Sequence, residues 1–323
     1  MMRKTQKGRL RTAIYYIFFF LHIASCTSVA PMTVFFQSPA FLSSPHGQVD
    51  LLFFECSGPE RLEAYQRAPV REGRLSYGLS GSGERRIAAI SAPGDSLFPY
   101  ADILYYGDLC QRVVSLDDED PDHPVLYGEV RVSEGISRTA EIRLRPALCR
   151  ILLRSVSCDF SGRPYAGSLF ENTRLYLTHA GTGYRPFGTE ERIPVQWMNT
   201  GMADSLACRS LTRPDMLLQD GLGPLGTKRQ TAGRRFYCYP NPATEDALGL
   251  SRTCLVLEGL VNGIRCYYPL PLPGMQAGGS YTLDVTLLRM GTPGPDIPAE
   301  PGTFQLDMHT EPWTYEPWVE IPF

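Results

Sequence analysis

Glycine and histidine residues form the patterns in this chain that come closest to a catalytic or cofactor-binding motif. Gly221, Gly223 and Gly226 have the spacing of a dinucleotide-binding turn. Such a turn must join a strand to a helix, whereas a proline lies inside this segment and a basic cluster follows it. The histidines after residue 25 are too widely separated to form a metal-binding pair; they are His46, His123, His179 and His309. The sequence therefore predicts no catalytic residue, no metal site and no cofactor, and we expect no enzymatic activity.

The first 26 residues carry a different chemical signal. Five basic residues precede an apolar run at residues 14–23, which is too short for a membrane span of about twenty residues. A basic start, a short apolar segment and small residues at its end are typical of a secretory signal peptide. The order Ile23-Ala24-Ser25-Cys26 resembles the lipoprotein box of bacteria. That resemblance implies cleavage after residue 25 and a lipid on the thiol of Cys26; the alternative is an ordinary signal peptide in which the cysteine occurs by chance.

The mature chain implied by this signal is acidic. The whole sequence has 31 basic and 34 acidic residues, and residues 1–25 hold five of the basic residues and none of the acidic ones. The remainder therefore has a net charge of −8, which provides no electrostatic basis for binding nucleic acid. Its length and the 43% hydrophobic content of the sequence suffice for two domains with true cores.

Eight cysteines follow Cys26, an even number that permits disulfides in an exported protein. Eight cysteines allow roughly a hundred pairings, and the sequence selects none of them. One hypothesis joins Cys254 to Cys266 across neighbouring antiparallel strands. Against disulfides in general, Cys149 and Cys254 lie in apolar runs, where a cysteine is most often a small buried hydrophobic residue.

The densest run of charge lies at residues 117–122, where five of the six residues are acidic. An EF-hand calcium loop needs spaced oxygen ligands, a central glycine and a final glutamate, and this run has none of them. We therefore expect residues 117–122 to form a solvated loop.

Short alternating segments separated by turn residues run through most of the chain. Residues 32–36 predict a first strand, and the apolar run at 49–54 predicts a buried strand. In the second half, Asn262-Gly263 predicts a hairpin, and residues 281–287 alternate apolar and polar side chains. Such segments, with turn signals about every eight to twelve residues, predict an all-β sandwich fold.

Three segments near the C-terminus carry the most specific pattern. They read Leu-Val-Leu-Glu-Gly at 255–259, Tyr-Tyr-Pro-Leu-Pro-Leu-Pro at 267–273 and Ser-Tyr-Thr-Leu-Asp-Val-Thr at 280–286. Arg289, Gly291, Pro-Asp-Ile-Pro at 295–298 and Trp313 follow in the same order. Together they resemble the end of the C-terminal domain of fimbrillins, the subunits of Bacteroidales type V pili. Residues 49–54, 73–79, 85–92 and 143–156 resemble the N-terminal half of that family more loosely.

The resemblance implies two transthyretin-like β-sandwich domains after a lipoprotein signal peptide, and assembly into a fimbria by strand exchange. We place the signal peptide at 1–25, the N-terminal domain at 26–190 and the C-terminal domain at 191–323. The expected partners are other fimbrial subunits, the outer membrane through the lipid on Cys26, and a host or glycan ligand. The candidate exchange segments are the first strand, with Met32, Val34 and Phe36, and the C-terminal segment, with Val319, Ile321 and Phe323.

The distribution of basic residues bears on the role within a fimbria. By resemblance, stalk subunits lose their first strand to an Arg- or Lys-specific protease, and the vacated groove accepts a strand of the next subunit. Residues 27–60 contain no lysine or arginine, so the first basic residue after Cys26 is Arg61. A cut there would remove both predicted strands. The sequence therefore favours an anchor or accessory subunit that keeps its lipid.

Three alternatives remain open. The chain could be a polymerising stalk or tip fimbrillin. It could also be a surface glycan-binding lipoprotein in which Trp197, Trp313 and Trp318 stack on sugar rings, although a tryptophan in a strand-rich chain is more often part of the core. A hydrolase with a dispersed site is the third.

Overall fold

The computed structural model describes residues 31–37, 48–69, 74–78, 83–91, 100–133, 139–188, 193–201, 207–245 and 250–313. Strands predominate in these residues, and the α-helix among them is the short α3 (Tyr106–Gln111). The predicted all-β fold class is confirmed. No helix in this part of the chain is long and apolar enough to cross a membrane.

The first pair of sheets is built from residues before 147. A five-stranded sheet has the order β3-β2-β5-β7-β9, and a three-stranded sheet has the order β4-β1-β8. Val34, Leu51 and Ile142, from the two sheets, share one apolar core. The strands are β1 (Pro31–Gln37), β2 (Gln48–Glu55), β3 (Leu62–Pro69), β4 (Arg74–Gly78), β5 (Glu84–Ser91), β7 (Leu126–Ser133), β8 (Thr139–Arg143) and β9 (Arg145–Pro146).

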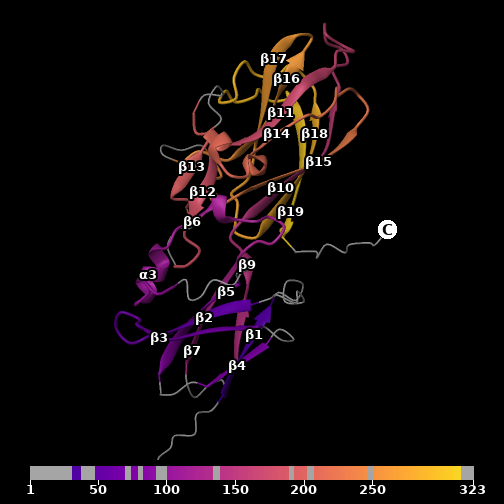
Figure 1. Cartoon of the computed structure of the whole chain (residues 1–323). Helices are drawn as coiled ribbons and strands as arrows, with labels where there is room; N and C mark the ends of the chain where they lie inside the picture. The colour runs from indigo at the N-terminus through magenta and orange to yellow at the C-terminus, as the bar shows by residue number, and fades with distance from the viewer. Residues whose placement is uncertain are drawn as a thin grey trace, which may run out of the picture.

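The second pair of sheets follows Pro146 and forms the opposite end of the molecule (Figure 1). Its sheets have the orders β15-β10-β18-β19 and β14-β11-β16-β17, and their inner faces share the largest core cluster. The strands are β10 (Cys149–Cys158), β11 (Phe170–Thr178), β14 (Leu218–Asp220), β15 (Gln230–Cys238), β16 (Cys254–Val261), β17 (Ile264–Pro271), β18 (Gly279–Leu287) and β19 (Phe304–Pro312).

A small third sheet ties the two pairs together. Its order is β13-β12-β6, so β6 (Val114–Ser115) from the first part of the chain pairs with β12 (Ala180–Tyr184) and, through it, with β13 (Gln196–Met198). Three short 3₁₀ helices lie nearby in sequence: η1 (Leu116–Asp118), η2 (Ala207–Ser210) and η3 (Pro214–Met216). Residues 114–118 thus leave the first pair of sheets and dock on the second.

Sheet membership changes between β9 and β10, earlier than the boundary that we placed at 190/191. Strands β10 and β11 precede residue 190, yet they pair with β15, β18, β14 and β16, all of which follow it. The physical reason is that partners in a β-sheet are chosen by side-chain packing across the sandwich, which local turn signals do not reveal.

The individual strands follow their patterns closely. The predicted hairpin joins β16 to β17, with Asn262 and Gly263 both at positive φ (51° and 75°), as a two-residue hairpin turn requires. Residues 281–287 lie in β18, in the middle of its sheet. The alternation at 281–287 was thus a true strand signal.

The expected Cys254–Cys266 pairing is wrong. Both residues lie in this hairpin, but Cys254 is opposite Pro271 and Cys266 is opposite Gly259. The two cysteines therefore lie several rungs apart on the ladder.

The expected solvated loop at residues 117–122 is also wrong in part. Glu119 is only 5% exposed, and its carboxylate accepts a hydrogen bond from the Tyr239 hydroxyl (3.1 Å). Asp117 accepts one from the backbone N–H of Thr212, and Asp120 pairs with Arg213. The acidic run is a docking segment, because its charged groups find donors in residues far along the chain.

Candidate strand-exchange site

Strand β1 occupies the centre of its sheet and faces the first core. It runs antiparallel to β4 and parallel to β8, so both of its edges carry ladder pairing. Its alternating sequence directs Met32, Val34 and Phe36 inward, where they are 6%, 0% and 7% exposed. Phe35, on the other face, is 42% exposed. The predicted first strand is confirmed, and its three candidate exchange residues are the ones that fill the core.

Loss of β1 would open a groove between β4 and β8. Burial of three side chains of this size contributes about 5–9 kcal/mol, comparable with the ~5–15 kcal/mol that stabilises a whole domain. The groove would also have two rows of unpaired backbone groups, a surface that a second strand can cover. An apolar alternating strand must therefore fill this groove, whether it comes from this chain or from another.

Strand β2 is more completely buried than β1. It lies between β3 and β5, and its six residues from Val49 to Phe54 are at most 2% exposed. Leu51 and Phe53 face the core shared with β1, whereas Leu52 and Phe54 face a second cluster under α3. A strand buried on both faces reads as a continuous apolar run, which explains the pattern at 49–54. Loss of β2 would therefore remove apolar side chains from both core clusters of the first pair of sheets.

Asp50 adds a polar contact to the face of β2 that also carries Leu52. It is 1% exposed and accepts hydrogen bonds from the Tyr65 hydroxyl (2.7 Å) and from Arg67 Nε (2.7 Å). Burial and the hydrogen bond to Asp50 raise the pKa of Tyr65 to about 12, so its hydroxyl remains a donor at neutral pH. Arg67, the second basic residue after Cys26, is thus tied to β2.

Arg61, the first basic residue after Cys26, lies in the turn between β2 and β3. Arg61 is exposed, but hydrogen bonds fix its own backbone and that of the next residue. The carbonyl of Arg61 accepts a hydrogen bond from the N–H of Glu55 (2.9 Å), and the next residue, Leu62, donates to the carbonyl of Leu104 (2.8 Å). A protease that needs an extended substrate must therefore break this pairing before it cuts after Arg61.

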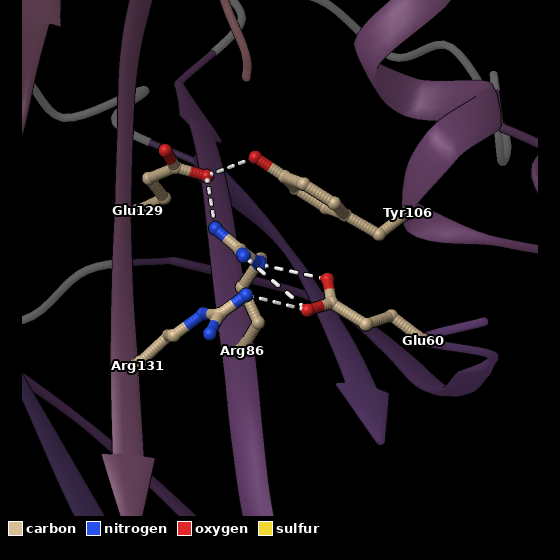
Figure 2. A network of polar contacts seen from close by, with 5 residues as sticks. All are labelled: Glu60, Arg86, Tyr106, Glu129 and Arg131. Carbon is tan, nitrogen blue, oxygen red and sulfur yellow. Dashed lines mark hydrogen bonds and ion pairs between the residues drawn. The ribbon is translucent and has the colours of Figure 1, made fainter. Parts of the chain in front are cut away.

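A network of charged side chains holds the residue before Arg61, as Figure 2 shows. Glu60 accepts hydrogen bonds from Arg86 Nε (2.9 Å) and Arg131 Nη2 (2.6 Å). Arg86 also contacts Glu129 (3.3 Å), whose same carboxylate oxygen accepts from the Tyr106 hydroxyl (2.5 Å). The network joins β5, β7, α3 and the turn after β2. It was missed in the sequence, although two arginines at the start of an apolar strand are a signal that could have suggested buried ion pairs.

The electrostatics of this network suit a fixed structural role. Arg86 has 8% of its side chain exposed, and its guanidinium carbon lies 3.9 Å from the centre of the Tyr106 ring. Burial and the hydrogen bond to Glu129 raise the pKa of Tyr106 well above its ordinary value, so the phenol donates throughout the physiological range. Among the described residues, no group of three or more His, Cys, Asp or Glu side chains could hold a metal ion.

The other candidate exchange segment, with Val319, Ile321 and Phe323, lies outside the described residues, as does Cys26. The last described strand, β19, is at the edge of its sheet, and among the described strands it pairs with β18 alone. Trp313 follows it and is 9% exposed, packed 5.7 Å from the Tyr237 ring. Among the described strands, one edge of β19 therefore has no ladder partner.

Little in the described residues matches a sugar-stacking surface. Trp313 is buried and Trp197 in β13 is partly buried, while Trp318 lies outside the described part. A hollow between the two pairs of sheets, lined by Tyr127, Arg145, Tyr184 and Phe187 among others, has a volume of about 230 Å³. That volume is below the roughly 300–1,000 Å³ typical of small-molecule sites.

Solved structures with a similar fold come from several bacterial species. A "putative cell adhesion protein" of Bacteroides eggerthii DSM 20697 matches with a TM-score of 0.61 and 15% identity, over 88% of this chain and 96% of that chain. Another protein of the same description, from Parabacteroides distasonis ATCC 8503, has a TM-score of 0.62 and 12% identity, over 88% and 96% of the two chains. A fimbrilin of Porphyromonas gingivalis W83 has a TM-score of 0.59 and 11% identity, over 88% and 98%.

These matches show a common architecture at low sequence identity. No protein-family model matches the sequence, and no curated protein matches it either. The matched regions cover nearly the whole of each solved chain. This chain has the fold of these cell adhesion and fimbrial proteins.

Proposed function

We propose that this protein is a structural subunit of a cell-surface fimbria, retained at the outer membrane by a lipid on Cys26. Within the fimbria it acts as an anchor or accessory subunit and binds other fimbrial subunits by strand exchange. The fold shared with a fimbrilin and with cell adhesion proteins supports this class, and the lipoprotein box supports the location.

The observation that carries the anchor role is the position of Arg61. Both β1 and β2 precede it, and β2 is buried between two cores. A cut after Arg61 or Arg67 would remove a central strand of the five-stranded sheet together with β1. A subunit that survives assembly therefore keeps β1 in its own groove, and its lipid with it.

With its own groove filled, such a subunit joins the fimbria through other segments. We propose that the segment with Val319, Ile321 and Phe323 pairs with an open sheet edge of a neighbouring subunit. We also propose two domains that meet near Pro146, where the sheets change. A ligand of the host or a glycan would then be bound by the assembled fimbria.

N-terminal mass spectrometry of the subunit in sheared fimbriae tests the anchor role. We expect an acylated Cys26 as the first residue, and loss of the protein from the outer membrane in a Cys26→Ala variant. A mature N-terminus at Leu62 or Ala68 would show a polymerising subunit instead.

A Leu42→Arg variant provides a matched control, because it places a basic residue between β1 and β2. With an Arg-specific protease present, this variant should be cut after residue 42 and lose only β1. The unchanged chain should keep its N-terminus under the same conditions. Equal cleavage of the two chains would show that the missing basic residue does not protect the lipid anchor.

A further inference from the structure

Cys149 and Cys238 lie directly opposite each other in the second pair of sheets. Cys149 begins β10, Cys238 ends β15, and the two are register partners in the antiparallel ladder. Opposed residues of such a ladder have Cα atoms about 4.5–5.5 Å apart, within the ~4.4–6.8 Å that a disulfide spans. Their side chains lie on the same face of the sheet and belong to the same core cluster.

The two thiols are buried, and one of them donates a side-chain hydrogen bond. Both residues are 0% exposed and carry thiols in the structure. Cys149 Sγ donates to the carbonyl of Gln276 (3.1 Å), and that carbonyl also accepts from the N–H of Gly279 (2.9 Å). The carbonyl keeps a partner if the thiol hydrogen is removed, so oxidation leaves no buried polar group unsatisfied.

We propose that Cys149 and Cys238 form a cross-strand disulfide in the exported protein. The inference rests on the export that the proposed function includes. The oxidant is a disulfide of a thiol–disulfide oxidoreductase. One cysteine thiolate attacks it and releases one oxidant thiolate; the second cysteine then attacks the mixed disulfide and releases the other. The protein pair loses two electrons and two protons, and the oxidant becomes a dithiol.

The bond forms during folding rather than after it. Burial raises the pKa of Cys238 to about 12 and that of Cys149 well above its ordinary value, so neither is a thiolate in the folded protein. Since the thiolate is the reactive form, exchange is fast only before β15 closes on β10. Strand β15 is an edge strand of its sheet and pairs with β10 alone among the described strands. The disulfide therefore links the buried end of this edge strand covalently to β10.

The neighbouring hairpin supplies a matched control pair. Cys254 and Cys266 also lie on paired antiparallel strands, but their ladder partners are Pro271 and Gly259. Their separation along the ladder prevents a disulfide without movement of the backbone. Variants of that pair should therefore change neither the linkage nor its effect on stability.

The test is non-reducing peptide mapping of the full mature chain, taken from cells after thiols are blocked with an alkylating reagent. The same mapping follows refolding of the purified chain in a glutathione redox buffer. We expect one peptide pair linked through Cys149 and Cys238.

A reductant should lower the Tm of the unmodified chain by about 5 °C or more. It should leave the Tm of a Cys149→Ala/Cys238→Ala variant unchanged, whereas a Cys254→Ala/Cys266→Ala variant should respond like the unmodified chain.

Two outcomes separate this proposal from the proposed function. If the protein lies at the cell surface but both cysteines are alkylated in cells and after refolding, the disulfide is overturned and the fimbrial role stands. If the protein fractionates with the cytosol, the fimbrial role and the disulfide in cells both fail. Refolding in glutathione then shows only whether the two cysteines are placed to pair.

Discussion

Arg85 and Arg86 are adjacent in β5, buried to 5% and 7% exposure, and point to opposite faces of the sheet. Arg85 pairs with Glu63 (2.7 Å), and Arg86 lies between Glu60 and Glu129. A buried charge is tolerated only when it is paired and hydrogen-bonded. These arginines therefore fix which carboxylates must surround β5, and so place the turn that contains Arg61.

Removing Arg86 should strongly destabilise the first pair of sheets. An Arg86→Ala variant leaves Glu60 and Glu129 without their buried partner, and we expect a loss of about 3–5 kcal/mol in the free energy of unfolding. Urea unfolding measures it, and an Arg-specific protease should cut the folded variant faster after Arg61. An Arg265→Ala variant is the control, because that side chain is 63% exposed and should cost below about 1 kcal/mol. Equal losses in the two variants would contradict a structural role for the network.

At the level of single strands, two neighbouring residues of β1 point to opposite faces, and their substitution should lower the stability by different amounts. Val34 is fully buried and Phe35 is 42% exposed. We expect Val34→Asp to lower the free energy of unfolding by about 4 kcal/mol or more, because it buries an unpaired charge. Phe35→Asp should cost much less. Guanidinium unfolding followed by circular dichroism compares the two, and similar costs would mean that β1 does not occupy its groove in solution.

The β16–β17 hairpin tests the turn chemistry. Gly263 has φ +75° with open space where a Cβ would lie, whereas Gly223 has the same open space without a positive φ. Gly263→Ala should therefore cost ~1 kcal/mol through backbone strain alone, and Gly223→Ala should stay within about 0.5 kcal/mol. Thermal unfolding of both variants provides the measurement. A neutral Gly263→Ala substitution would show that the turn does not need the left-handed conformation.

At the scale of the whole molecule, Glu119 lies where the first part of the chain docks on the second. It contacts Tyr239, whose ring stacks on Tyr184 with centroids 5.4 Å apart. Burial, opposed by the hydrogen bond from Tyr239 and assisted by Asp118 and Asp120, raises the pKa of Glu119 from 4.5 to about 7. The folded protein therefore favours the protonated carboxyl, and the stability that Glu119 contributes decreases as the pH rises.

The contribution of Glu119 to the free energy of unfolding should depend on pH. Because the folded pKa exceeds the unfolded one, the contribution of Glu119 is complete below about pH 4.5 and is lost as the pH rises through 7. A Glu119→Gln variant does not titrate, so its stability relative to the unmodified chain should increase between pH 5 and pH 8, by about 3 kcal/mol at most. Urea unfolding at several pH values measures the difference. A difference that does not change with pH would contradict the burial of a titrating carboxyl.

Much of the fold could be predicted because strand patterns are local. Alternation at β1 and the apolar run at β2 follow directly from which faces of each strand are buried. The hairpin at Asn262-Gly263 follows from two residues that tolerate positive φ. The candidate site could be predicted only in part. The spacing of Met32, Val34 and Phe36 indicates that they share one face of a strand, whereas no sequence spacing predicts the Glu60–Arg86 network.

The sequence alone shows the alternation of the strands, the acidic balance of the chain after residue 25, and the absence of a basic residue between Cys26 and Arg61. These are properties of neighbouring residues, so no partner needs to be known. The tertiary structure alone decided that β10 and β11 belong with the later strands, that the acidic run docks, and that Cys149 faces Cys238. Each of these joins residues far apart in the chain. Pairing between strands depends on packing across the sandwich, which no local pattern encodes.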